Sequence, residues 1–326
     1  FNNRLTMDLS IYNKKTNDLI IDRPLDPSTG YTSTQTNIGL IENKGAELDL
    51  SMNWFESQDG LNWSSSFNWS TNDAIVIDLG EDTDRIVFAG FGTLGNAAIP
   101  GESLGSIIGS SITRLGGRIE NSRWVDGGDY VVNNQGSYDE TFDPTIIGDA
   151  NPDWIANLSN TISYKNLSLN FLFNYQQGGD IFTYTVATLL GRGLTTDTLD
   201  RELSFVLPGV NSNGQPNTKM INNSTFYFSN VLYGPDEMLV YDASHWRLGE
   251  VSLSYNLPKN LIESTPFGSI SITASGFNLA YNAWNTPEGT NFDPNIAGVG
   301  IGNGRGFDFI NGPSARRYGG SIKLTF

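Results

Sequence analysis

The sequence predicts an all-β protein, an antiparallel transmembrane β-barrel, and three observations carry this prediction. Apolar and polar residues alternate with period two over several segments. Short and long connections between these segments alternate along the chain. The 326 residues include 36 Gly, 18 Phe, 13 Tyr and 7 Trp, yet only 17% are charged. This composition fits neither a disordered chain nor an ordinary helical enzyme.

Eight segments carry the alternation. In residues 46–54 every even position is apolar and every odd position polar, over a length that lets a tilted strand cross a membrane. Residues 61–70 follow after a short turn with the same alternation, so the pair predicts a hairpin with one polar face. The other six predicted strands are residues 5–11, 154–164, 167–176, 250–257, 270–274 and 318–326.

The connections between the predicted strands differ systematically in length. Short turns are expected at 57–60, 165–166 and 258–268, and long connections at 13–45, 71–152, 177–246 and 281–316. Outer-membrane barrels have short periplasmic turns and long extracellular loops. A chain that ends at Phe326, as bacterial outer-membrane proteins typically end, is expected to finish on the periplasmic side. Every long connection is then extracellular, and Trp54, Trp63 and Trp69 lie near strand ends, where interfacial aromatic belts belong.

The residues expected to point inward are small and polar. A closed barrel of eight strands is filled by its own side chains, whereas Ser, Asn and Gly suit a wide, watery lumen; the inward set includes Ser64, Ser66, Asn68, Ser168, Asn170, Gly319 and Ser321. We therefore expect one arc of a wider barrel, with further strands supplied from outside this sequence, because open strand edges are not tolerated in lipid. A soluble β-sandwich or jelly roll stays open as an alternative, and it predicts loops at both ends.

The composition excludes several functions. Without Cys there is no disulfide or thiolate site, and a single histidine, His245, cannot build a multi-His metal site. A formal charge of −16 argues against nucleic acid binding. No nucleophile pattern surrounds His245, whose expected place is the start of a strand. We expect no enzyme, no catalytic or metal residues and no cofactor. Residues 1–4 show no signal-peptide or lipid-anchor feature, and no apolar run is long enough for a membrane helix.

The long connections hold the remaining candidates. Residues 78–153 contain 13 acidic and 4 basic side chains, so 13 minus 4, or 9, of the 16 net negative charges lie there. We interpret them as a solvated loop; the alternatives are contact with a cationic substrate, a lid protein or divalent ions. Residues 81–84 and 126–129 offer oxygen ligands for calcium, although neither follows the 12-residue calcium-loop pattern. Residues 300–306 are Gly-rich but do not match a phosphate-binding loop, which favours a flexible extracellular tip.

Aromatic residues in the long connections suit either of two roles. They can stack on sugar rings or peptide side chains, or they can pack a loop against its neighbours. These residues are Trp124, Tyr130, Tyr138, Phe226, Tyr227, Phe228, Tyr233, Trp284 and Phe292. Alternation does not extend into these connections, so the substrate-binding residues are unknown at this stage.

Seven stretches, in order, resemble one family. They are YNKKTNDLI (12–20), NIGLIENKGAELDL (37–50), IIGDANPDW (146–154), HWRLGEVSLSYNLP (245–258), ASGFNLAYNAW (274–284), NFDPN (291–295) and RRYGGSIKLTF (316–326). Together they resemble the C-terminal portion of SusC/RagA-like TonB-dependent outer-membrane transporters of Bacteroidetes. The resemblance implies a 22-stranded barrel, of which residues 1–326 supply about the last eight strands, without the plug domain and early strands.

The resemblance also implies a function and partners. Such transporters import oligosaccharides or peptides together with a SusD-like surface lipoprotein that closes as a lid, and TonB supplies energy through a missing N-terminal region. Outer-membrane lipid is the expected surroundings, in a Gram-negative cell, and no nucleic acid partner is expected. One alternative keeps the barrel as a structural or docking subunit of an outer-membrane assembly or secretion complex. The other is a soluble carbohydrate-binding β-domain.

Overall fold

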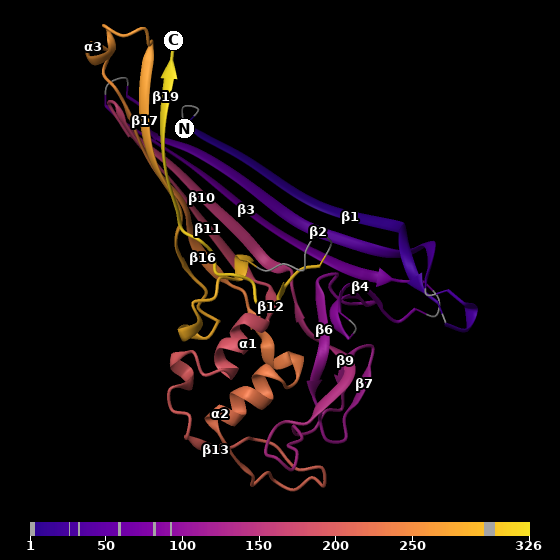
Figure 1. Cartoon of the computed structure of the whole chain (residues 1–326). Helices are drawn as coiled ribbons and strands as arrows, with labels where there is room; N and C mark the ends of the chain where they lie inside the picture. The colour runs from indigo at the N-terminus through magenta and orange to yellow at the C-terminus, as the bar shows by residue number, and fades with distance from the viewer. Residues whose placement is uncertain are drawn as a thin grey trace.

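The computed structural model describes residues 4–25, 27–31, 33–57, 60–80, 83–91, 93–296 and 304–326. Its main feature is one antiparallel sheet of eight strands, which we call the arc (Figure 1). In sheet order the strands are β1 (Leu5–Pro24), β2 (Ser33–Phe55), β3 (Leu61–Asp78), β10 (Pro152–Tyr164), β11 (Leu167–Gly178), β16 (His245–Asn256), β17 (Ser269–Asn282) and β19 (Arg317–Thr325). The eight predicted strands are therefore confirmed, and they form a single sheet rather than the two packed sheets of a sandwich.

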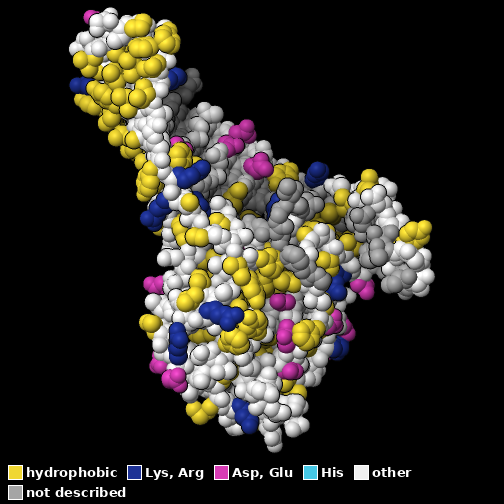
Figure 2. Space-filling model, in the orientation of Figure 1, with side chains coloured by type: hydrophobic (Ala, Val, Ile, Leu, Met, Phe, Trp, Pro, Cys, Tyr) yellow, Lys and Arg dark blue, Asp and Glu magenta, His cyan; other side chains and the backbone are white. Residues whose placement is uncertain are grey.

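The register of the arc separates its residues into two faces. Directly opposed residues of antiparallel strands lie on the same face. Leu50 lies opposite Met7 and Phe67, and this apolar row continues through Leu158, Phe173 and Leu248. The apolar side chains of this row are exposed or half-buried, and Figure 2 shows hydrophobic side chains gathered over the end of the arc formed by β17 and β19. Tyr255 of β16 lies opposite Ile272 of β17, which lies opposite Ile322 of β19, so the predicted apolar face is confirmed across all eight strands.

The prediction of a long connection over residues 13–45 is wrong. β1 and β2 pair from Leu5 opposite Met52 to Pro24 opposite Ser33, which makes both strands about twice as long as a membrane crossing requires. Residues 13–17 are polar at every position, so the alternation ends there. Backbone hydrogen bonding does not depend on alternation. The strands consequently continue beyond the region in which one face must be apolar.

A glycine on the polar face lets three strands be tied together by one side chain. Tyr12 of β1 lies directly opposite Gly45 of β2, and its hydroxyl donates to Asn72 Oδ1 of β3 over 3.1 Å. A Cβ at Gly45 would collide with the Tyr12 ring and hydroxyl. This contact gives a physical reason for the glycine in the stretch NKGAELDL.

The other three long connections are folded, and together they form what we call the loop body (Figure 1). Its strands are β4 (Ile86–Phe91), β5 (Leu94–Ala98), β6 (Ser106–Ile112), β7 (Arg118–Glu120), β8 (Arg123–Val125), β9 (Glu140–Asp149), β12 (Asp180–Thr183), β13 (Ser204–Val206), β14 (Met220–Asn222), β15 (Val240–Asp242) and β18 (Phe307–Asp308). Its helices and turns are α1 (Tyr184–Gly191), α2 (Asn223–Phe226), the π-helical turn η3 (Tyr227–Leu232), and the 3-10 turns η2 (Thr196–Thr198), η4 (Asp236–Leu239), η5 (Glu288–Thr290) and η6 (Pro294–Ile296). The loop body lies at one end of the arc.

The hydrophobic core belongs to the loop body. Phe182 of β12 and Phe307 of β18 are almost fully buried, and both strands carry their connection into the same cluster. Helix α1 is capped by Thr183, whose Oγ1 accepts the N–H of Val186, and it buries Val186 and Leu190, one turn apart. Side chains from the second, third and fourth connections therefore fold as one unit.

The opposite end of the arc carries the short connections. Lys165, at the turn between β10 and β11, has φ of 52°, and Asn166 donates to the carbonyl of Asn256 over 2.8 Å. The helical turn α3 (Lys259–Ile262) joins β16 to β17. In the part of the chain that the structure describes, no helix has the length and apolarity needed to cross a membrane.

Candidate functional site

The polar face of the arc presents a continuous row of hydrogen-bonding side chains. From β1 to β17 the row is Asp8, Asp49, Asn68, Asn157, Asn174, Arg247 and Tyr281. Neighbours in the row hydrogen-bond sideways: Asn68 donates to Asp49, and Asn174 donates to Asn157 Oδ1 over 2.6 Å. These lateral bonds fix the side chains of the wall while leaving other polar atoms for solvent or a solute.

The apolar face contains one polar cluster that satisfies itself. Asn160 is only 4% exposed, and its Oδ1 accepts from Trp63 Nε1 at 3.0 Å and from the Ser65 hydroxyl at 2.5 Å. Trp54 Nε1 in turn donates to Ser65 Oγ over 2.9 Å. Indole donors thus cover polar atoms that would otherwise be costly on an apolar surface.

Aromatic side chains form two belts at opposite ends of the apolar face. Near the short turns, the Trp54 and Trp63 ring centroids are 5.4 Å apart. At the end next to the loop body, Tyr175 stacks on Trp154 at 4.9 Å and contacts Trp284 at 5.7 Å. Trp69, opposite Leu48 and Ala156, lies toward this second belt rather than with Trp54 and Trp63.

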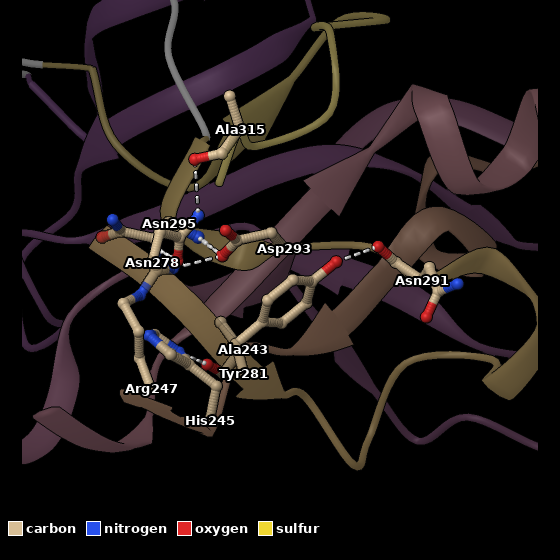
Figure 3. A network of polar contacts seen from close by, with 9 residues as sticks. All are labelled: Ala243, His245, Arg247, Asn278, Tyr281, Asn291, Asp293, Asn295 and Ala315. Atoms are coloured by element: carbon tan, nitrogen blue, oxygen red, sulfur yellow. Dashed lines mark hydrogen bonds and ion pairs between the residues drawn. The ribbon is translucent and has the colours of Figure 1, made fainter. Parts of the chain in front are cut away.

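A buried ion pair joins the arc to the last long connection (Figure 3). Arg247 of β16 donates through Nη2 to Asp293, which is 1% exposed, and through Nη1 to Asn278 Oδ1 over 2.8 Å. Asp293 also accepts the backbone N–H of Asn295 at 3.1 Å. The hydroxyl of Tyr281 donates to the carbonyl of Asn291 (Figure 3). Residues 291–295 are therefore anchored on two strands of the arc, on β16 through Arg247 and on β17 through Tyr281.

The strand end predicted for His245 is confirmed. β16 begins at His245, and its Nδ1 lies 2.8 Å from the carbonyl oxygen of Ala243, to which the ring N–H donates (Figure 3). This bond fixes the ring at the point where the chain passes from the loop body into the arc.

Half-buried carboxylates connect the second and third long connections. Asp236 Oδ2 accepts the N–H of Ser110 at 2.9 Å, and Glu237 Oε1 accepts the N–H of Ile112 at 3.2 Å. Burial raises the pKa of Asp236 and of Glu237 above their ordinary values, and the accepted N–H groups partly oppose this. Asp180 acts in the same way toward the N–H of Asp149, at 2.8 Å. These acids act as caps on backbone groups of β6 and β9.

The fourth connection is held by Asp308. Its Oδ2 accepts from the Thr183 hydroxyl at 2.8 Å and from the N–H of Thr185 at 3.0 Å, at the start of α1. Its Oδ1 accepts the N–H of Asn311 at 3.0 Å. A negative charge at a helix N-terminus is favourable, so one buried carboxylate fixes both the helix and the chain that returns to β19.

Three acids of the second connection form ion pairs with two of its bases. Arg118 donates to Glu120 and Asp126 at 2.6 and 2.5 Å, and Arg123 pairs with Glu102. Asp126, a candidate calcium ligand, is therefore engaged by a guanidinium. Residues 81 and 82 of the other candidate lie outside the described residues. Among the described ranges, no group of three or more acidic or His side chains is arranged to hold a metal ion.

The prediction of a flexible tip at residues 300–306 is wrong for its last two residues, and residues 300–303 lie outside the described ones. The N–H of Arg305 donates to the buried Asn96 Oδ1 at 2.8 Å. The carbonyl of Gly306 accepts the N–H of Phe182 at 2.8 Å. This segment is anchored because it crosses the core of the loop body.

The loop aromatics separate into different places. Trp124 and Tyr130 flank the guanidinium of Arg114 at 5.9 and 5.5 Å, and Phe292 is 4% exposed within the core. The rings of Tyr130 and Tyr138 lie 5.7 Å apart, and Phe228 and Tyr233 form a surface pair at 4.9 Å. Phe226 and Tyr227 line a cavity. Trp284 and Phe292 line another cavity, in the fourth connection.

The third connection exposes seven apolar side chains. We call this set the outer apolar surface; it comprises Leu194, Leu199, Leu203, Val206, Met220, Phe228 and Tyr233. Val206 pairs with Met220 across β13 and β14, and the carbonyl of Leu203 accepts the N–H of Asn223. β13 lies at the end of the molecule opposite the chain termini (Figure 1). Alternation did not reveal this surface, because its residues lie in short strands and turns.

Comparison with known proteins gives consistent results. A family model described as TonB dependent receptor-like, beta-barrel, matches residues 1–172. TonB-dependent receptors P3 and P26 of Formosa agariphila are each 29% identical, over 86% and 100% of this chain and 28% and 33% of their own lengths. The RagAB peptide transporter structure aligns with TM-score 0.67 and 22% identity, covering 100% of this chain and 34% of that one. The RagAB peptide importer in its closed-closed state gives 0.66 and 21%. The chain thus spans about a third of the length of these relatives.

Proposed function

Because the chain belongs to the TonB-dependent receptor-like β-barrel family, we propose that it forms part of the wall and the mouth of an outer-membrane importer. The imported solute is an oligosaccharide or a peptide. In this proposal, residues 1–326 are the C-terminal part of a single barrel domain of about 22 strands. The early strands and the plug belong to the rest of the protein, and TonB acts through that part.

The observation that carries the proposal is the two-faced arc with a folded body at one end only. The apolar face suits lipid, and its two aromatic belts suit the two membrane interfaces. The polar face suits a water-filled passage for a polar solute. The loop body then lies outside the cell, because the short connections occupy the periplasmic end.

The partner we propose is a SusD-like surface lipoprotein that closes over the mouth. The outer apolar surface supports this assignment, since it exposes the apolar pairs Val206 with Met220 and Phe228 with Tyr233, and exposed apolar groups on a water-facing body suit an interaction site. RagAB, whose fold the chain shares, is a peptide transporter. The ion pair of Arg247 with Asp293 supports a mouth that keeps its shape while a lid moves.

The test uses the intact protein in its own host. Deletion of the gene should abolish growth on the imported oligosaccharide or peptide, and affinity purification of the intact protein should recover the lipoprotein with bound ligand. Met220→Glu together with Leu199→Glu should weaken recovery of the lipoprotein, because charges replace apolar contacts. Ser212→Glu with Asn213→Glu, two exposed polar positions of the same connection, is the matched control.

Two outcomes would contradict import. Recovery of assembly or secretion subunits without any ligand would assign the barrel to a structural or docking role in a larger outer-membrane complex. Full solubility of the intact protein without detergent would contradict a membrane barrel and favour the soluble carbohydrate-binding β-domain.

A further inference from the structure

An open cavity of about 380 Å³ lies on the loop body, between α1, η3 and β15. Apolar walls come from Leu190 and Val231, which are both buried, and from Met238. Pro287, from the fourth connection, borders it on another side. Its size is in the range of pockets that take small molecules or single side chains.

Three polar residues line this cavity. They are Asp197, which is exposed, and the tyrosines Tyr227 and Tyr241. Burial raises the pKa of Tyr241 to about 12, with the nearby Tyr227 and Asp197 adding to the effect, so its hydroxyl is neutral at physiological pH. None of the residues that line the cavity is basic, and none of the ion pairs formed by the described residues includes Asp197.

We infer that this cavity binds the cationic side chain of a peptide, a lysine ammonium or an arginine guanidinium. The aliphatic stem would pack on Leu190, Val231 and Met238, and the charged group would pair with Asp197 at the rim. The rings of Phe226 and Tyr227 supply aromatic surface for the same cation. The chain's net charge of −16 raises the local concentration of cations further.

A neutral sugar fits this cavity less well than a cation. A buried sugar needs a donor or acceptor for each hydroxyl, because unpaired polar groups are costly in an apolar site. The cavity has only three side chains that can supply such partners, Asp197, Tyr227 and Tyr241, because Leu190, Val231 and Met238 offer none. The inference rests on the proposed function in one respect: it selects peptides over oligosaccharides as the solute.

Two peptides that differ at one position test the inference on the full-length protein in detergent. They are an acetylated, amidated Ala-Ala-Lys-Ala-Ala peptide and its norleucine counterpart, whose side chain keeps the stem without the charge. We expect the lysine peptide to bind about tenfold more tightly, with a preference that shrinks in high salt. Asp197→Asn should remove most of this preference, and Tyr241→Phe should reduce it less.

Glu202→Gln is the matched control, because Glu202 is an exposed acid nearby that does not line the cavity. It should leave the preference unchanged, and heat-modifiable gel migration should report the same fold for every variant. Equal binding of the two peptides, no binding of either, or a lysine preference that survives Asp197→Asn would overturn the inference.

The outcomes separate this inference from the proposed function. If binding depends on Asp197 but cells take up no solute, the cation-binding cavity is supported and the proposed import function is contradicted. If cells take up peptides or oligosaccharides equally well with Asp197→Asn, the proposed import function is supported and the cation-binding cavity is contradicted.

Discussion

The arc and the loop body are stabilised by different surroundings. Of the buried apolar side chains in the described residues, only Ala74, Val76 and Ala156 belong to strands of the arc. The loop body holds nearly all the others, including Phe182 and Phe307. A sheet whose apolar face stays exposed needs lipid around it, whereas the loop body folds around a core as a water-soluble protein does. Changes of volume should therefore damage the body, and changes of charge the arc.

The largest effect is expected from a cavity in the core of the body. Phe182 is 2% exposed, with ring centroids 6.0 Å from Phe307 and 5.7 Å from Phe309. Phe182→Ala should destabilise the body by about 3–5 kcal/mol, because the lost contacts leave a void. Limited proteolysis of intact cells should show cleavage in the connections, while the barrel keeps its heat-modifiable migration.

Phe142, a phenylalanine that is 71% exposed in β9, provides the control. Phe142→Ala should change protease resistance little. Equal sensitivity of the two variants would contradict a single packed core in the body.

The junction between the two regions should respond almost as strongly. Asp293→Ala should cost about 3–5 kcal/mol, since it leaves the guanidinium of Arg247 without its buried partner. The double variant Arg247→Leu with Asp293→Leu should recover part of the loss, because no unpaired charge remains. Additive losses in this cycle, measured by chemical denaturation in detergent, would show that the two residues do not act as a pair.

A charge introduced on the apolar face of the arc should impair membrane insertion more than a charge introduced on its polar face. Leu50→Arg should impair insertion by about 2–4 kcal/mol near the membrane centre, whereas the adjacent Ser51→Arg should be far milder. Leu50 lies opposite Met7 and Phe67, and Ser51 lies opposite Thr6 and Ser66. Folding yield into lipid vesicles measures the difference, and comparable yields would refute the assignment of the faces.

These two regions also differ in how far the sequence foretells them. Lipid requires an apolar residue at every second position of a crossing strand, so the alternation found all eight strands. Beyond Tyr12 no such requirement holds, and the continuation of β1 was missed. Contacts in the body join distant residues: Asp308 and Thr183 are 125 positions apart, and Arg305 and Asn96 are 209 apart. A local sequence pattern does not reveal contacts between residues so far apart in the chain.

The candidate site was foretold only in part. The stretches at 245–258 and 291–295 contain Arg247 and Asp293, but nothing in either stretch indicates that the two form a buried pair. The sequence predicts that the acidic side chains of residues 78–153 are solvated. The acids with the clearest structural role, Asp236 and Asp308, lie in other connections and cap backbone groups.

The smallest expected effect is a pH dependence confined to the body. Burial raises the pKa of Asp236, so the folded body holds this proton more tightly than the unfolded chain. This contribution to stability is fully present below the ordinary carboxyl pKa and is lost as the pH rises through the raised value. Protease resistance of the body should therefore increase modestly from neutral toward mildly acidic pH. Asp236→Asn should flatten that increase, and exposed Asp143→Asn should not.

The most direct test of the two-faced arc uses the absence of cysteine from the chain. Single cysteines at positions 47 to 52, in otherwise cysteine-free protein in lipid vesicles, are treated with a water-soluble maleimide. We expect labelling at Glu47→Cys, Asp49→Cys and Ser51→Cys, and protection at Leu48→Cys, Leu50→Cys and Met52→Cys. Uniform labelling, or labelling of the even positions, would contradict a β2 strand with one face toward lipid and the other toward water.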